Sequence, residues 1–222
     1  MQLFQVLLVL HVAGGSLALL AGTLAASVRK GRKWHLLGGK LFFYGVFIAS
    51  VCSLIITNMH GHENIFLFAV AGFALYMASS GYRMIILKRK YNNSDLVFSW
   101  VDYLVLIFGL TFGLFLCLLA VKGFGKGNLL ALSPCIFGLL CLWFSSADLS
   151  LAAGKKAIKL TWLYNHIIRM ISALGALYIA FLVVNVDVEQ SWLLWLAPAV
   201  TGIAAIVFFI RKFVSGKSPQ KI

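Results

Sequence analysis

A histidine and an arginine lie one helical turn apart near the start of an apolar stretch, TWLYNHIIRMISALGALYIAFLVVN, at residues 161–185. His166 and Arg169 are three positions apart, a spacing that places both side chains on one face of a helix. Alanines recur on the same face every three or four residues, a pattern that lets membrane helices approach closely. We therefore expect His166 and Arg169 to face other helices, where ionisable residues are candidates for function.

Six ionisable side chains are expected at one level near a single membrane face. The level is found by counting about 20 residues, the length that crosses a ~30 Å apolar core, from one end of each apolar stretch. The set consists of His35, Arg83, Asp102, Asp148, His166 and Arg169. Ions inside membranes usually pair with one another, so the two aspartates could simply neutralise the two arginines. The alternative is a site that binds an anionic head group, a proton or a cofactor.

A second group of ionisable residues is expected near the opposite face. It consists of His11, His60, His62 and Glu63. His11 begins a stripe of glycines and alanines spaced three and four apart, so it is expected to face protein rather than lipid. Imidazoles bind zinc, copper and iron, and the H-G-H-E run therefore makes His11, His60 and His62 a candidate transition-metal site. A solvated loop explains His60 and His62 equally well.

Haem is the other cofactor that these histidines could hold, since helix bundles ligate it with one histidine from each of two helices. His11 and His166 cannot share one haem, because ~30 Å of apolar core separates the two faces. The pairs that remain are His11 with His60 or His62, and His35 with His166. The sequence places three of these residues in loops or beyond the apolar core, which disfavours haem because an axial ligand must be held rigidly.

The elements that must position these residues are membrane-spanning helices. The 222-residue chain is 62% hydrophobic and 11% charged, whereas soluble domains are about 45–50% apolar and about 25% charged. Seven apolar stretches are long enough to cross a membrane: about 3–28, 41–58, 65–87, 101–121, 129–148, 166–185 and 191–210. No gap has room for a soluble domain, so residues 1–222 are predicted to form one all-α, seven-span transmembrane bundle.

Lysine and arginine are distributed unevenly over the gaps between these stretches. Sixteen of the 19 lie in alternate gaps and in the C-terminal tail, two lie in the other gaps, and Arg169 lies within a stretch. The positive side of a membrane protein is cytoplasmic, so the N-terminus is expected outside and the C-terminus inside. The net charge of +13 therefore indicates orientation in a lipid bilayer rather than nucleic-acid binding.

Four groups of segments carry a resemblance to other proteins. They are LHVAGGSLALLAG (10–22), KGRKWHLLGGKLFFYG (30–45), SGYRMIILKRK (80–90) with VDY (101–103), and WLYNHIIRMISALGALYIAFLVVN (162–185). They resemble one bacterial family of small multi-pass integral-membrane proteins that is described only as a domain of unknown function. The resemblance implies a bacterial cytoplasmic (inner) membrane and no particular reaction. It implies as site residues His11, His35, Arg83, Asp102, Asp148, His166 and Arg169.

Three functions are consistent with the sequence. A binding or redox bundle holds a small cofactor, a metal or a head group in the layer that contains His166. A transporter moves a small solute or protons along the polar residues, although the centres of the stretches carry no charge, and transporters usually place their site there. A structural or partner-binding membrane subunit needs no site. The patterns leave open whether the chain is an enzyme.

Overall fold

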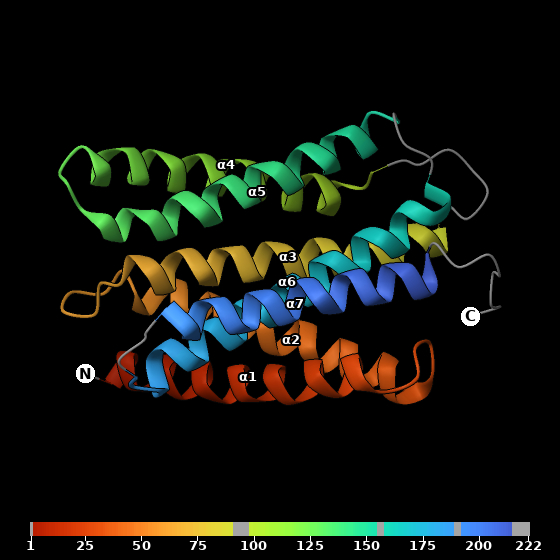
Figure 1. Cartoon of the computed structure of the whole chain (residues 1–222), viewed down its shortest axis with the longest axis horizontal. Helices are drawn as coiled ribbons and strands as arrows, with labels where there is room; N and C mark the ends of the chain where they lie inside the picture. Colours follow the sequence, from red (N-terminus) through yellow and green to blue (C-terminus); the bar gives the residue numbers. More distant parts are fainter. Residues whose placement is uncertain (1, 91–97, 155–157, 189–191, 215–222) are drawn as a thin grey trace.

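The computed structural model describes residues 2–90, 98–154, 158–188 and 192–214, and within these ranges it consists of helices and loops (Figure 1). The helices are α1 (Gln2–Ser27), α2 (Lys33–Ile56), α3 (Ile65–Lys90), α4 (Trp100–Phe124), α5 (Leu132–Ala152), α6 (Ile158–Asn185) and α7 (Trp192–Phe213), with a 3-10 turn at Leu129–Ala131. Each of the seven α-helices is long and apolar enough to cross a membrane. For the part of the chain described here, the predicted all-α, seven-span fold is therefore confirmed.

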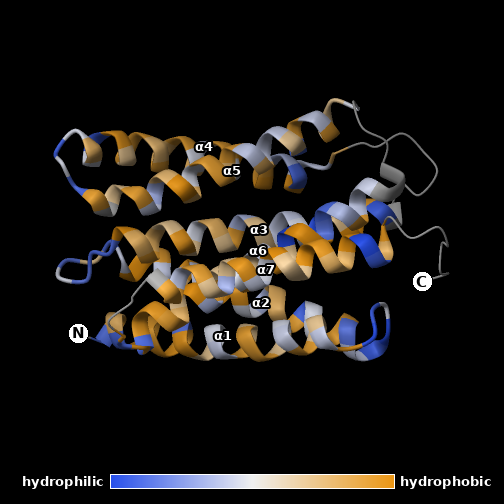
Figure 2. Cartoon of the chain, in the orientation of Figure 1, coloured by the Kyte–Doolittle hydropathy of each residue, from blue (hydrophilic) through white to orange (hydrophobic). Residues whose placement is uncertain are grey.

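The outside of the bundle is as apolar as its interior. Leu20 exposes 75% of its surface and Trp143 exposes 74%. The middle of every helix is hydrophobic, and hydrophilic residues gather at the two ends of the bundle (Figure 2). In lipid the backbone must satisfy its own hydrogen bonds, which long helices achieve. The exposed apolar faces are consistent with an integral membrane protein.

Helix α3 is the centre of the bundle. It packs against α2, α4, α5 and α6, whereas α1 packs mainly on α2, α4 on α5, and α7 on α6. Figure 1 shows the α4–α5 pair on one side of α3 and α6, and the α1–α2 pair on the other. In its most apolar window α3 has 61% of its residues buried, and α7 has 6%. Side chains on α3 are therefore placed to link several helices at once.

Two helices begin about two turns earlier than the apolar stretches predict. The second stretch was expected to begin near residue 41 and the sixth near residue 166, but α2 starts at Lys33 and α6 at Ile158. The extra turns contain polar residues, which lower hydropathy without interrupting backbone hydrogen bonds. His35, predicted to lie in a gap, is therefore on the first turn of α2. His166 lies more than two turns inside α6 instead of at its start.

The direction of the chain across the membrane stays a prediction. Helix α1 begins at one end of the bundle and α7 ends at the other (Figure 1), as an odd number of spans requires. The charge argument also counts lysines outside the described ranges: Lys155, Lys156, Lys217 and Lys221.

Glycines allow a close helix contact between α1 and α2. A Cβ atom added at Gly45 would lie 2.7 Å from the carbonyl oxygen of Gly14 and 2.9 Å from the backbone nitrogen of Ala18. Both neighbours are backbone atoms, which cannot move without separating the two helices. On the same helix, a Cβ atom added at Gly39 would meet no atom within 4 Å.

We expect Gly45→Ala to destabilise the bundle by on the order of 1–3 kcal/mol, the usual cost of overpacking. Gly39→Ala is the matched control, and it should be neutral or slightly stabilising because alanine favours helix. Thermal unfolding of the two purified variants in detergent measures the difference. Equal unfolding temperatures for the two variants would contradict the close contact.

Candidate functional site

The six ionisable residues predicted at the level of His166 are called the inner layer below. Two of them, Arg83 and Asp102, form a closed ion pair between α3 and α4. Arg83 Nε donates to Asp102 Oδ1 at 2.6 Å, and Arg83 Nη2 donates to Oδ2 at 2.8 Å. The Ser99 backbone N–H and hydroxyl also donate to Oδ2, at 2.8 and 2.6 Å. Ser99 precedes the first turn of α4, where a carboxylate favourably meets the positive end of the helix dipole. Both carboxylate oxygens of Asp102 thus accept hydrogen bonds, and those from Arg83 join α4 to α3.

The second pair is deeper and joins three helices. Arg169 on α6 and Asp148 on α5 expose 0% and 4% of their surfaces. Arg169 Nη1 lies 2.7 Å from Asp148 Oδ1 and 2.8 Å from Oδ2, and it is oriented for a hydrogen bond to Oδ2. Tyr76 on α3 donates its hydroxyl to the same Oδ2 at 2.6 Å. The two arginines and two aspartates are thus paired, which assigns these four residues a role in holding helices together.

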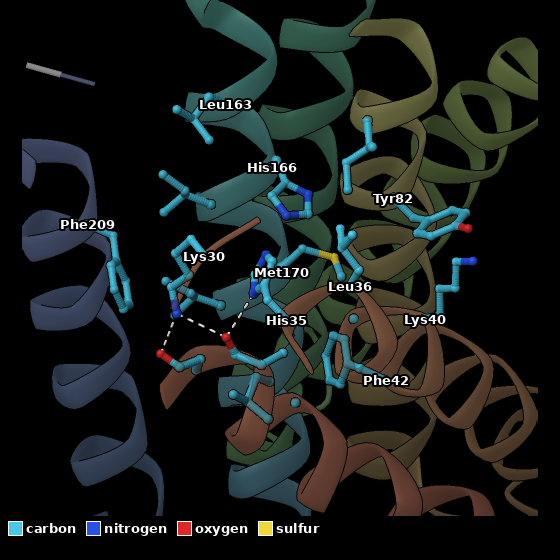
Figure 3. Close-up of a pocket in the computed structure, with 18 of the residues that line it drawn as sticks. Lys30, His35, Leu36, Lys40, Phe42, Tyr82, Leu163, His166, Met170 and Phe209 are labelled. Carbon is cyan, nitrogen blue, oxygen red and sulfur yellow. Dashed lines mark hydrogen bonds between the residues drawn. The ribbon is translucent and has the colours of Figure 1, made fainter. Parts of the chain in front are cut away.

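The two remaining inner-layer residues, His35 on α2 and His166 on α6, line one cavity. Its volume is about 220 Å³, and residues of α1, α2, α3, α6 and α7 surround it. His35 Nδ1 bonds to the carbonyl oxygen of Ala25 at 3.0 Å, and His166 Nδ1 bonds to that of Gly81 at 2.9 Å. Figure 3 shows the two imidazole rings turned toward each other inside the cavity. The structure therefore brings together histidines that are 131 positions apart in the chain.

These hydrogen bonds fix which ring nitrogen is protonated. A carbonyl oxygen has no proton to give, so Nδ1 must be the donor in both rings. The Nε2 atom of a neutral imidazole then carries a lone pair and acts as an acceptor or a metal ligand. Histidines that bind metals in proteins are usually oriented in this way, by a bond from the other ring nitrogen to a carbonyl or carboxylate oxygen. Two such lone pairs face one apolar cavity here.

Lys30 adds a positive charge to the cavity wall. It follows α1, and its Nζ donates to the carbonyl oxygens of Ala25 and Ala26 at the C-terminal end of that helix. Ala25 O accepts from both Lys30 and His35, so one carbonyl orients two polar groups (Figure 3). The ammonium group lies 4.5 Å from the centre of the Phe209 ring on α7. Burial lowers the pKa of Lys30, and the nearby charge of Lys212 lowers it further.

The rest of the cavity wall is mainly aliphatic and aromatic. Phe42, Ile167 and Met170 lie beside the histidines. Gly39 also lines the cavity, and the absence of any atom within 4 Å of an added Cβ shows that free space lies beside it. The site thus combines an apolar interior with two imidazoles and two lysines, Lys30 and Lys40. This arrangement suits a flat or elongated apolar ligand that carries a metal or hydrogen-bond donors and an anionic group.

The predicted outer-face residues do not form a cluster. His62 stacks on Phe4 with ring centres 3.9 Å apart, and Phe4 lies seven residues, about 10 Å along α1, from His11. His60 is fully exposed, with Nδ1 3.5 Å from Glu63. His11 Nδ1 bonds to Ala49 O at 2.8 Å. Among the described residues, no three His, Cys, Asp or Glu side chains are grouped to hold a metal. The metal site proposed for His11, His60 and His62 therefore gains no support.

No family model, curated protein or solved structure matches the chain. The family resemblance seen in the sequence therefore stays a prediction, and the function must be argued from the site.

Sequence reasoning missed two residues that matter to these sites, Tyr76 and Lys30. Tyr76 lies seven positions before Arg83, so both are on one face of α3, and this spacing was a usable signal. Lys30 was counted only as an orientation charge, and nothing in the sequence indicates that its side chain folds back onto the end of α1.

We expect Arg169→Met to destabilise the protein by about 3–5 kcal/mol, because it leaves the Asp148 carboxylate buried without its counter-charge. A triple variant, Tyr76→Phe/Asp148→Leu/Arg169→Met, removes the polar cluster as a whole and should recover most of that loss. Chemical unfolding in detergent measures both. If the triple variant is as unstable as the single one, the cluster does more than pair charges.

Proposed function

We propose that this chain is an integral-membrane haem-binding protein of the electron-carrier class, in which His35 and His166 would hold the haem iron. One observation carries the proposal: two imidazoles from different helices, each oriented by an Nδ1 bond to a backbone carbonyl, line the same cavity. The sequence already named this pair as a feasible one. The objection that His35 lies in a loop no longer applies, because it is on α2.

The protonation state of the His35 and His166 rings determines which kind of ligand the cavity can bind. Both Nε2 atoms are lone-pair donors when the rings are neutral, so the ligand must offer a Lewis acid or two hydrogen-bond donors. A quinone offers only acceptors and fits poorly, whereas a metal fits both rings at once. Two imidazoles alone leave a bare zinc ion two ligands short of its usual four. Haem iron brings four equatorial nitrogens of its own and needs two axial ligands.

The cavity wall supports the same choice. The porphyrin of haem is a large apolar plane, which suits the aliphatic and aromatic lining around Phe42 and Met170. Haem also carries two carboxylates, and Lys30 supplies a cation at the cavity wall. A haem with both axial positions occupied by protein carries electrons rather than binding oxygen. In the chain itself, the carbonyl oxygens of Ala25 and Gly81 orient the two histidines.

The transport and structural hypotheses account for fewer of these contacts. Two arginines and two aspartates are engaged in bonds between helices, which favours fixed helix positions over a moving carrier. A purely structural subunit explains those pairs but not two histidines directed into a shared cavity. The ion pairs and the histidine cavity therefore have separate roles.

Protein made in cells that synthesise haem and purified in detergent should be coloured, with a Soret band and about one haem per chain by the pyridine haemochrome assay. His35→Ala and His166→Ala should each lose the haem or convert it to a high-spin form, because one axial ligand is gone. His11→Ala is the matched control, since His11 makes the same kind of Nδ1 bond but does not line the cavity.

Two results would count against haem. One is protein that is colourless as purified and stays so after hemin is added. The other is an unchanged spectrum in both cavity variants. If colourless wild-type protein releases a quinol on solvent extraction and the two variants do not, the cavity binds a hydrogen-bond donor instead of haem.

Filling the cavity offers a test that leaves both histidines in place. Gly39→Leu should lower haem occupancy several-fold, because the new side chain enters the free space beside Gly39. Gly202→Leu is the control on α7, where an added Cβ meets its nearest atom only at 4.0 Å and the residue does not line the cavity. The ratio of Soret to protein absorbance measures occupancy. Equal ratios in the two folded variants would place the haem elsewhere.

A further inference from the structure

A second hollow adjoins the histidine cavity at the end of the bundle. It lies between the loop that joins α1 to α2 and the last turns of α7, and its volume is about 930 Å³. The two spaces share four residues: Ala26, Lys30, Phe209 and Phe213. Three further cations line the hollow and do not line the histidine cavity: Arg29, Arg32 and Lys212. The hollow is therefore distinct from the histidine cavity, and its lining is strongly positive.

No carboxylate balances these charges in the part of the chain that the structure describes. Asp102 and Asp148 are committed to their arginines. Glu63 follows α2 and Asp187 follows α6, so both lie at the other end of the bundle. The lining itself contains no acidic residue. The repulsion from Lys212 that lowers the pKa of Lys30 indicates that these two lysines lie close enough to oppose one another. An anion placed among them removes this repulsion.

Aromatic side chains form the other wall of the hollow. Lys212 Nζ lies 5.4 Å from the Phe208 ring centre and 5.5 Å from that of Phe213, and Lys30 lies over Phe209. Helix α7 has little buried surface, so its apolar side is open to lipid beside these cations. Cations at helix ends, next to an apolar face, match a molecule with an anionic head and apolar tails.

We propose that the hollow formed by Arg29, Lys30, Arg32 and Lys212 binds a phosphate group, supplied by the head group of an anionic phospholipid. The guanidinium groups of Arg29 and Arg32 are suited to phosphate oxygens, which they contact through paired N–H donors. The two lysines contribute charge, and the phenylalanines contact the first part of the acyl chains. This site stands whether or not the histidine cavity holds haem, because three of its four cations do not line that cavity.

Lipid binding can be measured by thermal unfolding of the full chain in detergent with added lipid. Phosphatidylglycerol should raise the unfolding temperature by several degrees, and phosphatidylcholine at equal concentration should not. The triple variant Arg29→Gln/Arg32→Gln/Lys212→Gln should bind phosphatidylglycerol roughly 100-fold more weakly, since each cation near a membrane surface contributes about 1 kcal/mol. The matched control, Lys33→Gln/Lys88→Gln/Arg211→Gln, removes as much charge from residues that do not line the hollow.

The outcomes separate the sources of the phosphate. A shift that is lost only in the Arg29/Arg32/Lys212 variant supports the site. An equal shift with inorganic phosphate alone supports a phosphate site that is filled from water rather than from lipid. Equal losses in the two triple variants would mean general charge attraction and would overturn the proposal. So would the absence of any difference between the two lipids with the wild-type chain. Haem content, measured on the same samples, reports separately on the histidine cavity.

Discussion

The buried ion pair between Asp148 and Arg169 is the interaction on which the rest of the structure depends. With the Tyr76 hydroxyl, it fixes α3, α5 and α6 against one another. Arg169 sets the rotation of α6, and His166 lies one turn away on the same face. Helices α3 and α6 approach closely there, since a Cβ added at Gly81 would lie 3.0 Å from Arg169 Cβ. That approach lets His166 reach Gly81 O and directs its ring into the cavity. A structural interaction thus positions the candidate chemical site.

The layer of ionisable residues that contains His166 serves two purposes. Desolvated charges in lipid are costly unless paired, which explains why both arginines and both aspartates are closed into bonds between helices. The histidines can be buried without a counter-charge, because a neutral imidazole needs only one partner for its N–H. They are consequently the residues of the layer with a lone pair left for a ligand. Bonding therefore distinguishes the two ion pairs, which hold helices together, from the two histidines, which can bind a ligand. Depth in the membrane does not distinguish them.

Much of the fold could be predicted from the sequence, because seven apolar stretches separated by polar gaps leave few alternatives in lipid. The layer that contains His166 could be predicted by counting residues for the same reason. The starts of α2 and α6 could not be predicted in this way. Polar residues such as His35 lower the hydropathy although they continue the helix. Helix rotation and the packing of distant segments determine which residues pair and which carbonyl each histidine contacts. The position of the Lys30 side chain follows from that packing, so only its residue type was visible beforehand. For Tyr76 the seven-residue spacing from Arg83 was visible, but its bond to Asp148 was not.

We propose that His35 and His166 would hold one haem iron between α2 and α6. Electron paramagnetic resonance of the oxidised, haem-loaded protein tests it most directly, because the spin state of ferric haem reports its axial ligands. We expect a low-spin signal of the kind given by two imidazoles. A high-spin signal from the wild-type protein, or a failure of the protein to retain any haem, would contradict it.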